Sequence, residues 1–309
     1  MDRQPPAVGV QAADDGGAHP PRGAGYQGYR SFVHALVSAL IFSIRIVSVN
    51  DWLTAVLLGV IEGLTEFLPI SSTGHLLIAE EWLGRRSDLF NVAIQAGAIL
   101  AVCLVYRTRL LQLARDWRQP EAFGYLSKIA VAFGITAVLG LIAKKLGAEL
   151  PDTVTPIAVA LIVGAFVIFA VEAWAKRQPA MAELTWKVAV AVGVAQVVAG
   201  VFPGTSRSAA AIFAAMLAGL TLRPRAAEFA FLVGIPTMFA ATGYELLKVL
   251  KSGEAVAAEP WGQLGLAFVV AAITGFAAVR WLLGFIGNHS FVPFAWYRLA
   301  LGAVLLLAL

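Results

Sequence analysis

Apolar runs of membrane-spanning length are the feature that most restricts how this chain can fold. Seven uninterrupted runs are predicted to be spans, at residues 32–49, 89–106, 128–146, 154–174, 227–249, 262–284 and 293–309. A helix needs about 20 residues to cross the apolar layer of a bilayer. Because only helices and closed barrels satisfy their own backbone polar groups there, runs of this length predict an all-α, polytopic membrane helical bundle.

The composition agrees with a membrane protein and excludes several other classes. Hydrophobic residues make up 59% of the 309 residues, charged residues 14%, and the formal net charge is +4. Most Lys and Arg residues lie in short segments between apolar runs, so we interpret them as topology signals and expect no nucleic-acid partner. The single cysteine, Cys103, excludes an intrachain disulfide, and the four scattered His residues exclude a His-rich metal site.

The N-terminal segment differs from the rest of the chain. Residues 1–30 are rich in Pro, Gly and Ala and lack an apolar periodic core, which predicts a disordered tail. Residues 31–309 are predicted to form a single integral membrane domain. Its first run, at 32–49, lacks a clear small-residue cleavage site, so we expect an uncleaved helix there.

Two further apolar stretches, 52–83 and 187–220, are interrupted near their centres by Pro, Gly and hydroxyl residues. The interruptions are Pro-Ile-Ser-Ser-Thr-Gly at 69–74 and Pro-Gly-Thr-Ser-Arg-Ser at 203–208. Each half is too short to span comfortably, and non-helical backbone at that depth is tolerated only beside protein or a water-filled cavity. Both stretches are therefore predicted to be re-entrant helix–break–helix hairpins whose tips face one interior site.

The two interrupted stretches also resemble each other when one is displaced by 134 positions. The matched pairs include Gly59 with Gly193, Glu62 with Gln196, Pro69 with Pro203 and Ser72 with Ser206. This similarity predicts an internal repeat, with repeat one at about 51–150 and repeat two at about 185–285. Basic segments at 107–118, 176–177 and 223–225 are assigned to the cytoplasm, which outweighs Lys144 and Lys145 and gives the repeats inverted topology.

Two carboxylates lie in the first interrupted stretch. Glu62 and Glu66 are four residues apart on a predicted helix, so both side chains lie on one face. In apolar surroundings they are close enough to share a proton or a divalent cation. The alternative is a pair of solvated interfacial acids, which the apolar neighbours at 56–61 disfavour.

Hydroxyl groups and one guanidinium lie at the breaks themselves. Each hydroxyl of Ser71, Ser72 and Thr73 has two interpretations, because it can cap the next helix or help to bind an anion at that helix N-terminus. The second break offers the same geometry together with Arg207. A guanidinium at that depth needs an anionic partner, which is either a phosphate bound through two hydrogen bonds or a structural ion pair with Glu62 or Glu66.

The remaining titratable residues have weaker signals. His75, one turn after the Pro69 break, can act as a general acid, base or nucleophile, although a lone His in an apolar helix is more often a hydrogen-bonded core residue. Arg280 and Arg298 lie near predicted span ends, where we expect their side chains to snorkel to the interface.

The segments 62–75 and 203–208 resemble the undecaprenyl-diphosphate phosphatase family linked to bacitracin resistance. The similarity extends from about residue 51 to the C-terminus and includes 95–100 and 228–236. The resemblance implies an integral phosphatase of the bacterial inner membrane that hydrolyses undecaprenyl diphosphate to undecaprenyl phosphate and inorganic phosphate, and so recycles the cell-wall lipid carrier. It also implies assistance by a divalent cation, Mg²⁺ or Ca²⁺, and a site facing the outer side.

Site residues follow from the matched motifs. The resemblance implies catalytic roles for Glu62, Glu66, Ser72, His75 and Arg207, with Glu62 and Glu66 also as metal ligands. It implies that the substrate phosphates contact Ser71, Thr73, Thr205, Ser206 and Ser208. Thr205 replaces the aromatic residue usual in the family, a difference expected to change only local shape.

Two questions stay open from the sequence. For the attacking group we favour Ser72, activated by Glu66 or His75, over a metal-bound water or direct attack by His75. A transporter or flippase of polyprenyl phosphate is the alternative function, because inverted repeats with paired broken helices are typical of secondary transporters.

Overall fold

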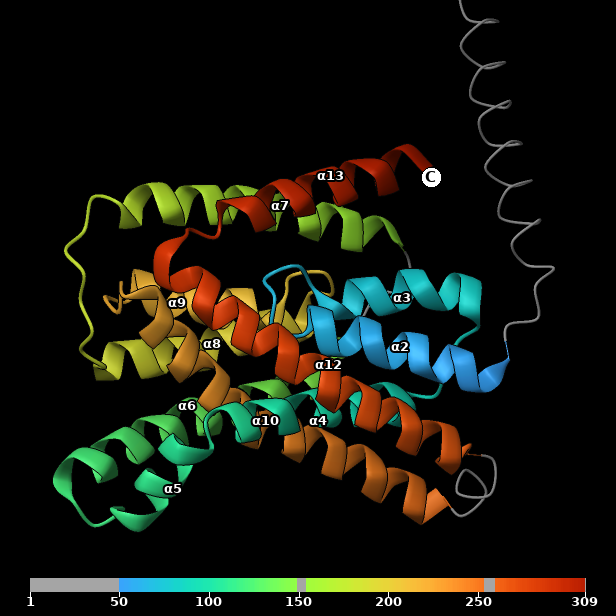
Figure 1. Ribbon diagram of the computed structural model, residues 1–309, viewed down its shortest axis with the longest axis horizontal. Coiled ribbons are helices and arrows are strands. Elements are labelled where there is room, and N and C mark those ends of the chain that lie inside the picture. Colours follow the sequence, from blue (N-terminus) through green and yellow to red (C-terminus); the bar gives the residue numbers. More distant parts are fainter. Residues whose placement is uncertain (1–49, 149–153, 253–258, 309) are drawn as a thin grey trace, which may run out of the picture. The chain divides into compact units, whose positions relative to one another are not determined.

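The computed structural model describes residues 50–148, 154–252 and 259–308, which form eleven helices and no strand (Figure 1). In chain order the helices are α2 (Asp51–Thr65), α3 (Ser72–Leu83), α4 (Asp88–Val105), α5 (Arg107–Arg115), α6 (Pro120–Lys145), α7 (Val154–Ala175), α8 (Trp186–Val201), α9 (Arg207–Leu217), α10 (Arg223–Ser252), α12 (Trp261–Asn288) and α13 (Val292–Ala308). The all-α class is thus confirmed for these residues. The predicted tail and the predicted helix at 32–49 lie outside them.

Five of the helices, α4, α6, α7, α10 and α12, are long and apolar enough to cross a membrane. They correspond to five of the predicted spans and confirm a multi-pass membrane protein. The last predicted span is the 17-residue helix α13, which is shorter than the about 20 residues needed for a full crossing.

The segment that follows α4 differs from the prediction. Residues 107–118 were expected to form a basic loop, but most of them form the short helix α5. Helix α6 then begins at Pro120, well before the predicted start at 128, because Pro suits the first helical position and Glu121 complements the N-terminal dipole.

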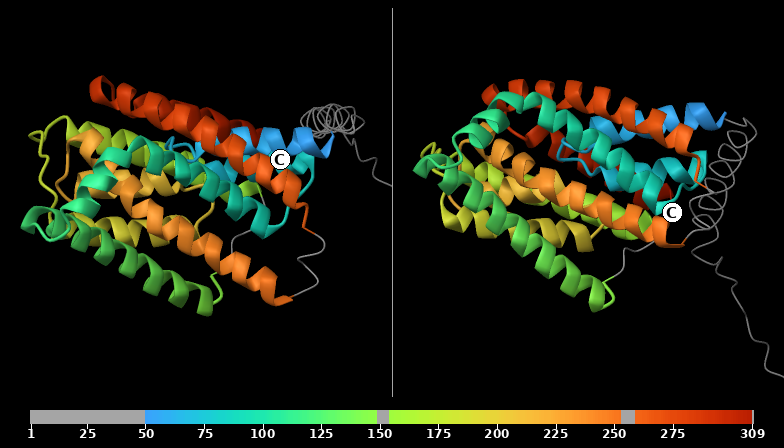
Figure 2. Two further views of the ribbon diagram at one scale, coloured as in Figure 1. Left: turned by 60° about the horizontal axis from the view of Figure 1, so that its bottom comes forward. Right: turned by 90° about the horizontal axis from the view of Figure 1, so that it is seen from below.

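The interrupted stretches form two helix–break–helix units, α2–α3 and α8–α9. In each unit both helices lead from a short break toward the same end of the bundle, and the two units lead toward opposite ends (Figures 1 and 2). The breaks meet in the middle, where the Ser208 hydroxyl donates to the Leu68 carbonyl at 3.2 Å. The re-entrant placement of these units in a bilayer stays a prediction.

The two units pack on the long helices in the same way. Helix α2 packs on α12 and α8 packs on α6, at glycines that allow close approach. A Cβ atom on Gly59 would lie 2.6 Å from the Ala267 oxygen, and one on Gly193 would lie 2.7 Å from the Ala132 oxygen. This shared arrangement supports the internal repeat, whose inverted orientation stays a prediction.

The register of the repeat changes at the breaks. Ser71 and Ser206 each cap the following helix in a left-handed conformation, with φ of 75° and 69°, and each accepts a backbone N–H at 3.3 Å. These two caps are 135 positions apart, whereas Gly59 and Gly193, like Pro69 and Pro203, are 134 apart. The second break therefore has one extra residue between its proline and its cap. The first helical residues, Ser72 and Arg207, are therefore the structural equivalents, and the predicted pairing of Ser72 with Ser206 is wrong.

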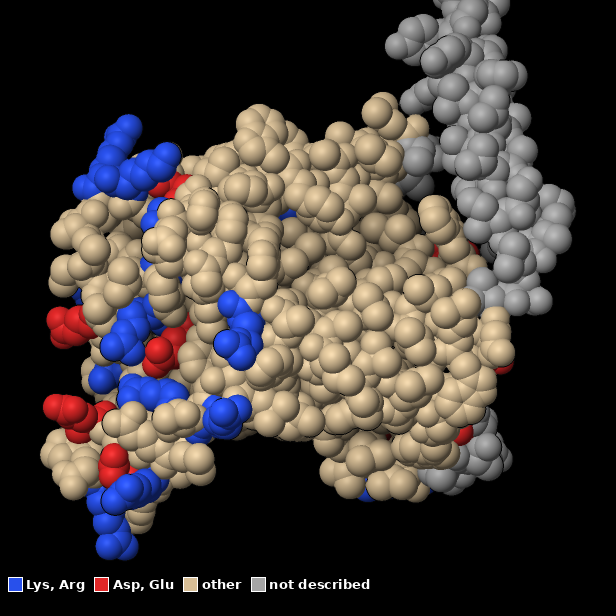
Figure 3. Space-filling model, viewed as in Figure 1, with Lys and Arg blue, Asp and Glu red and all other residues tan. Residues whose placement is uncertain are grey.

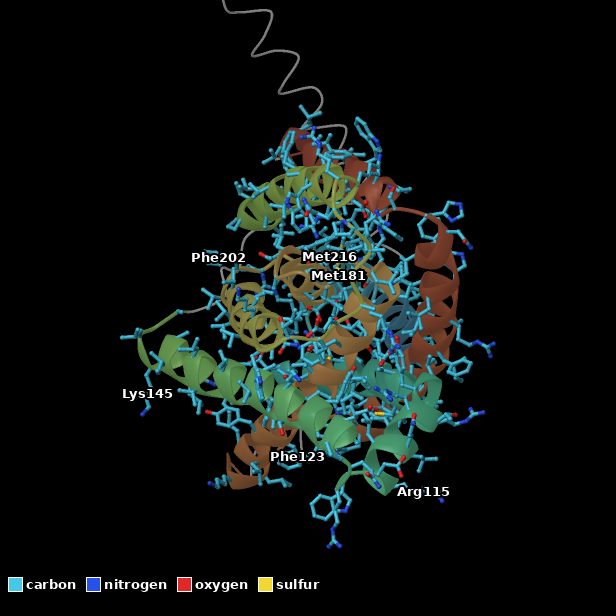
Figure 4. The ribbon with its side chains drawn as sticks, turned by 90° about the vertical axis from the view of Figure 1, so that its left-hand side faces the viewer. Arg115, Phe123, Lys145, Met181, Phe202 and Met216 are labelled. Carbon is cyan, nitrogen blue, oxygen red and sulfur yellow. The ribbon has the colours of Figure 1, made fainter. Side chains whose placement is uncertain are left out.

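Basic residues concentrate at one end of the bundle. On the face shown in Figure 3, Lys and Arg side chains gather at the end where α5 lies, while the broad central part carries almost no charge. Figure 4 looks onto this end, with Arg115 at the end of α5 and Phe123 near the start of α6. An uncharged belt beside a basic end is the pattern expected of a membrane protein with this end in the cytoplasm.

Candidate active site

Two adjoining cavities lie where the breaks meet, and Glu66 and Arg207 line both of them. The polar cavity is also lined by the hydroxyl residues Ser71, Ser72, Thr73 and Ser206. The other cavity is mainly apolar and extends toward α4 and α10, where Ile99, Phe231 and Met238 line it. The site therefore joins a place for an anion to a place for an apolar group.

Ser72 and Glu66 face each other across the first break. Ser72 is the first residue of α3 and Glu66 follows the end of α2, so the break turns the chain back and brings the two side chains together. The Ser72 hydroxyl donates to Glu66 Oε2, and both residues are buried, with 6% and 8% of their surface exposed. A carboxylate that accepts a hydrogen bond from a hydroxyl in this way can act as a general base for it.

Glu62 lies one helical turn before Glu66 and is fully buried, at 0% exposure. No N–H or hydroxyl donor of the described residues reaches either of its carboxylate oxygens, and its side-chain neighbour is the Glu66 carboxyl group. An unpaired buried carboxylate costs several kcal/mol, roughly 3–5, unless a proton or a cation neutralises it. The carboxylate oxygens of Glu62 and Glu66 are donors that suit a hard divalent cation. The described residues contain no cluster of three or more His, Cys, Asp or Glu. Phosphate oxygens would therefore have to complete the coordination shell of the cation.

Arg207, the first residue of α9, approaches this carboxylate pair from the second break. Its guanidinium makes no hydrogen bond or salt bridge within the part of the chain that the structure describes, while its charge acts on Glu62 at longer range. The structural ion pair considered from the sequence is thus not formed. The guanidinium is free to bind an anion in either cavity.

The hydroxyl residues divide into three groups. Ser71 and Ser206 cap α3 and α9, and both line the polar cavity together with Thr73. Ser208 lines the apolar cavity, and its hydroxyl donates to the Leu68 carbonyl in the first break. Thr205 lines neither of these two cavities, and its carbonyl instead accepts a hydrogen bond from Arg298 at 3.3 Å. Of the predicted phosphate contacts, Thr205 is the one that the structure sets apart.

His75 also lies outside both cavities. Its Nδ1 atom is 2.7 Å from the Ser71 carbonyl oxygen, and its Nε2 atom is 2.6 Å from the Tyr297 hydroxyl. The partner of the Ser72 hydroxyl in this arrangement is Glu66 and not His75.

Arg298 of α13 supports the site through a structural role that the sequence did not predict. We expected its side chain to snorkel, but it is fully buried at 0% exposure. The guanidinium donates to five carbonyl oxygens at 2.9–3.3 Å, those of Ala160 and Leu161 on α7, Pro69 in the first break, and Gly204 and Thr205 in the second. Its place inside the apolar run 293–309, five residues after the start, was the signal available in the sequence.

Space for this guanidinium comes from Gly164 on α7. A Cβ atom there would lie 2.0 Å from Arg298 Nη2 and 2.6 Å from Cζ, so any side chain at position 164 displaces the arginine. The glycine is therefore required by close packing, even though it stands in the interior of a helix.

Gln196 of α8 occupies the position that Glu62 occupies in the first unit. It is buried and lines the apolar cavity, and its Oε1 atom accepts hydrogen bonds from the hydroxyls of Thr136 and Thr237, each at 3.1 Å. A neutral amide here leaves the site with carboxylates from one unit only.

The fold and the site define a multi-pass helical membrane protein with an internal centre of paired carboxylates, a buried hydroxyl and a free guanidinium. The chain belongs to the bacitracin resistance protein BacA family, whose sequence pattern matches residues 55–304. A relative from Rhizobium etli strain CIAT 652, named undecaprenyl-diphosphatase, is 62% identical over 257 residues, which cover 83% of this chain and 96% of that protein. A relative of the same name from Xanthomonas axonopodis pv. citri strain 306 is 58% identical over 258 residues, which cover 84% and 97%.

The contact between Gly164 and Arg298 gives a stability prediction. We expect Gly164→Ala to lower the Tm of the purified protein by at least about 5 °C, because overpacking displaces a buried, multiply bonded guanidinium. Gly140→Ala on α6 is the matched control, since a Cβ atom there meets nothing within 4 Å. Thermal unfolding in detergent, followed by tryptophan fluorescence, measures both. Equal Tm values for the two variants would show that the Arg298 contacts do not stabilise the bundle.

Proposed function

We propose that this protein hydrolyses undecaprenyl diphosphate to undecaprenyl phosphate and inorganic phosphate in the bacterial inner membrane, and thereby recycles the lipid carrier used in cell-wall synthesis. The family assignment and the enzyme name carried by close relatives support a phosphatase. The observation that carries the proposal is the buried Ser72–Glu66 pair opposite the unpaired Arg207. The alternative of a transporter or flippase has no comparable support.

The residues suggest how a diphosphate would be bound. Its phosphate oxygens would occupy the polar cavity, where the Arg207 guanidinium and the free amides at the N-termini of α3 and α9 provide positive charge and donors. The polyprenyl chain would leave through the adjoining apolar cavity. In this pose the terminal phosphorus lies next to the hydroxyl of Ser72.

Phosphoryl transfer then follows from the side chains present. The Ser72 oxygen attacks the terminal phosphorus as its proton passes to Glu66, and undecaprenyl phosphate leaves. Arg207 stabilises the charge that develops on the transferred phosphoryl oxygens. The departing phosphate takes the proton from Glu66, which is then a carboxylate again. Glu66 next accepts a proton from the water that attacks the phosphoserine and returns it to the Ser72 oxygen as inorganic phosphate leaves.

A divalent cation, Mg²⁺ or Ca²⁺, is part of the proposal. When bound, it would neutralise negative charge on the phosphate oxygens. Glu62 and Glu66 are the residues that would hold it, and the unpaired buried oxygens of Glu62 support this assignment. The role of Glu62 would then be limited to binding the cation. Glu66 would bind the cation with one carboxylate oxygen and accept the Ser72 hydrogen bond with the other.

The side of the membrane is also proposed. The open end of the α2–α3 unit lies away from the basic end of the bundle, which the positive-inside rule assigns to the cytoplasm. We therefore place access to the site from the outer side.

Arg207 is the first residue whose substitution tests the function. We expect Arg207→Ala to reduce the rate of phosphate release from undecaprenyl diphosphate by at least about a hundredfold, the effect of losing a positioned donor to the transition state. Arg280→Ala is the control, because that side chain is exposed on α12 and stands over the Phe276 ring, away from both cavities. Near-normal turnover of a folded Arg207→Ala protein would remove Arg207 from the site.

The attacking group is tested by trapping. We expect rapid acid quenching during turnover to recover phosphate covalently bound to Ser72, identified by mass spectrometry of the digested protein. Ser127→Ala, at a half-buried serine of α6 whose hydroxyl donates to the Phe123 carbonyl, should leave the signal intact, whereas Ser72→Ala should abolish it. If no phosphoserine accumulates even in a variant with slowed hydrolysis, attack by water replaces attack by Ser72.

A further inference from the structure

The His75 ring is fixed at both nitrogen atoms. A carbonyl oxygen can only accept, so the 2.7 Å contact to the Ser71 carbonyl requires a proton on His75 Nδ1. In the neutral ring Nε2 then accepts from the Tyr297 hydroxyl at 2.6 Å. The two rings also stack, with centroids 5.7 Å apart and an interplanar angle of 9°. These contacts select one tautomer and one ring orientation.

The bonded carbonyl belongs to the residue directly before the proposed nucleophile. Ser71 is a non-glycine residue with φ of 75°, a conformation that costs about 1–3 kcal/mol and persists only where its surroundings hold it. Its carbonyl accepts from the backbone N–H of His75 at 3.2 Å as well as from the ring. The imidazole therefore constrains the turn from which the Ser72 side chain projects.

The second unit contains the same turn without a histidine. Ser206 has φ of 69°, and among the described residues the one hydrogen bond found to its carbonyl comes from the backbone N–H of Ala210, at 2.9 Å. Ala210 stands four residues after its cap, as His75 stands four residues after Ser71. The cap conformation thus forms without an imidazole, so His75 contributes something that the anion-binding unit does not need.

Tyr297 connects this turn to a rigid element. It precedes Arg298 on α13, and Arg298 donates to the Pro69 carbonyl in the same break at 3.2 Å. Two adjacent residues of α13 thus hold the first break at two points, Arg298 at Pro69 and Tyr297, through His75, at Ser71.

We propose that His75 and Tyr297 are positioning residues, which lock the Ser71 turn against α13 so that the Ser72 hydroxyl faces Glu66, and that the imidazole exchanges no proton with the substrate. The proposal deepens the function proposed above and rests on it. It assigns the base to Glu66 and gives Tyr297 a role that its exposed position would not suggest.

Substitutions at position 75 separate positioning from acid–base catalysis. Asn carries an N–H donor where Nδ1 stands but cannot act as an acid, base or nucleophile, so His75→Asn should keep kcat within about tenfold of the wild type, the effect of perturbing one hydrogen bond. His75→Ala should lose more of kcat than His75→Asn, with little change in KM. It should still fold, because Ala210 follows an identical cap in the second unit.

The pH–rate profile and Tyr297 supply two further readouts. His75→Asn should keep every limb of the wild-type profile of kcat against pH. Tyr297→Phe should lower kcat several-fold in the wild-type background, and it should add little in the His75→Asn background, where no tautomer has to be selected. Tyr244→Phe, at an exposed tyrosine beside Lys144, is the control and should be neutral.

The outcomes that contradict the inference are distinct. If His75 is the base or nucleophile, His75→Asn and His75→Ala lose activity equally, by about 10²–10⁴-fold, and a limb of the pH profile disappears. If the wild-type protein is active, that result overturns the positioning role of His75 and Tyr297 but leaves the proposed phosphatase function standing. A folded wild-type protein that releases no phosphate overturns the proposed function and this inference together.

Discussion

The candidate site depends on how backbone carbonyl groups find hydrogen-bond donors at the two breaks, where α2 and α8 end inside an apolar bundle. The ends of α2 and α8 leave carbonyl oxygens without helical donors, and no water of the bulk solvent replaces them at that depth. Arg298 donates to five carbonyls from both breaks and from α7, which ties three segments distant in sequence to one guanidinium. The site exists because this residue fixes one break against the other.

This constraint also explains why two arginines beside the breaks, the buried Arg298 and the partly buried Arg207, behave differently. The guanidinium of Arg298 is saturated by carbonyl groups, so it acts as a structural donor. Arg207 has no such partners among the described residues and stays available for an anion. The single extra residue in the second break places Arg207 at the first position of α9, where the first unit has Ser72. The same turn therefore presents the Ser72 hydroxyl beside two carboxylates in the α2–α3 unit and the Arg207 guanidinium in the α8–α9 unit.

Sequence reasoning located the site but not the contacts that hold it. Proline, glycine and hydroxyl residues inside apolar runs predicted both breaks, and the length of the runs predicted α4, α6, α7, α10 and α12, because these signals are local. The roles of Arg298 and Tyr297, the register change at the second break and the helix α5 were missed. The first two depend on partners more than 90 positions away in the chain, and a one-residue insertion at a break leaves the apolar pattern unchanged.

We propose that this site hydrolyses a diphosphate with help from a cation, and that it does not merely bind a lipid phosphate. The most direct test is phosphate release from undecaprenyl diphosphate by the purified protein in detergent, where no gradient can drive transport, before and after treatment with EDTA. We predict release that EDTA abolishes and added Mg²⁺ or Ca²⁺ restores. Binding of the lipid without phosphate release by the folded, cation-loaded protein would contradict the proposed function, and release that EDTA leaves unchanged would contradict the role of the cation.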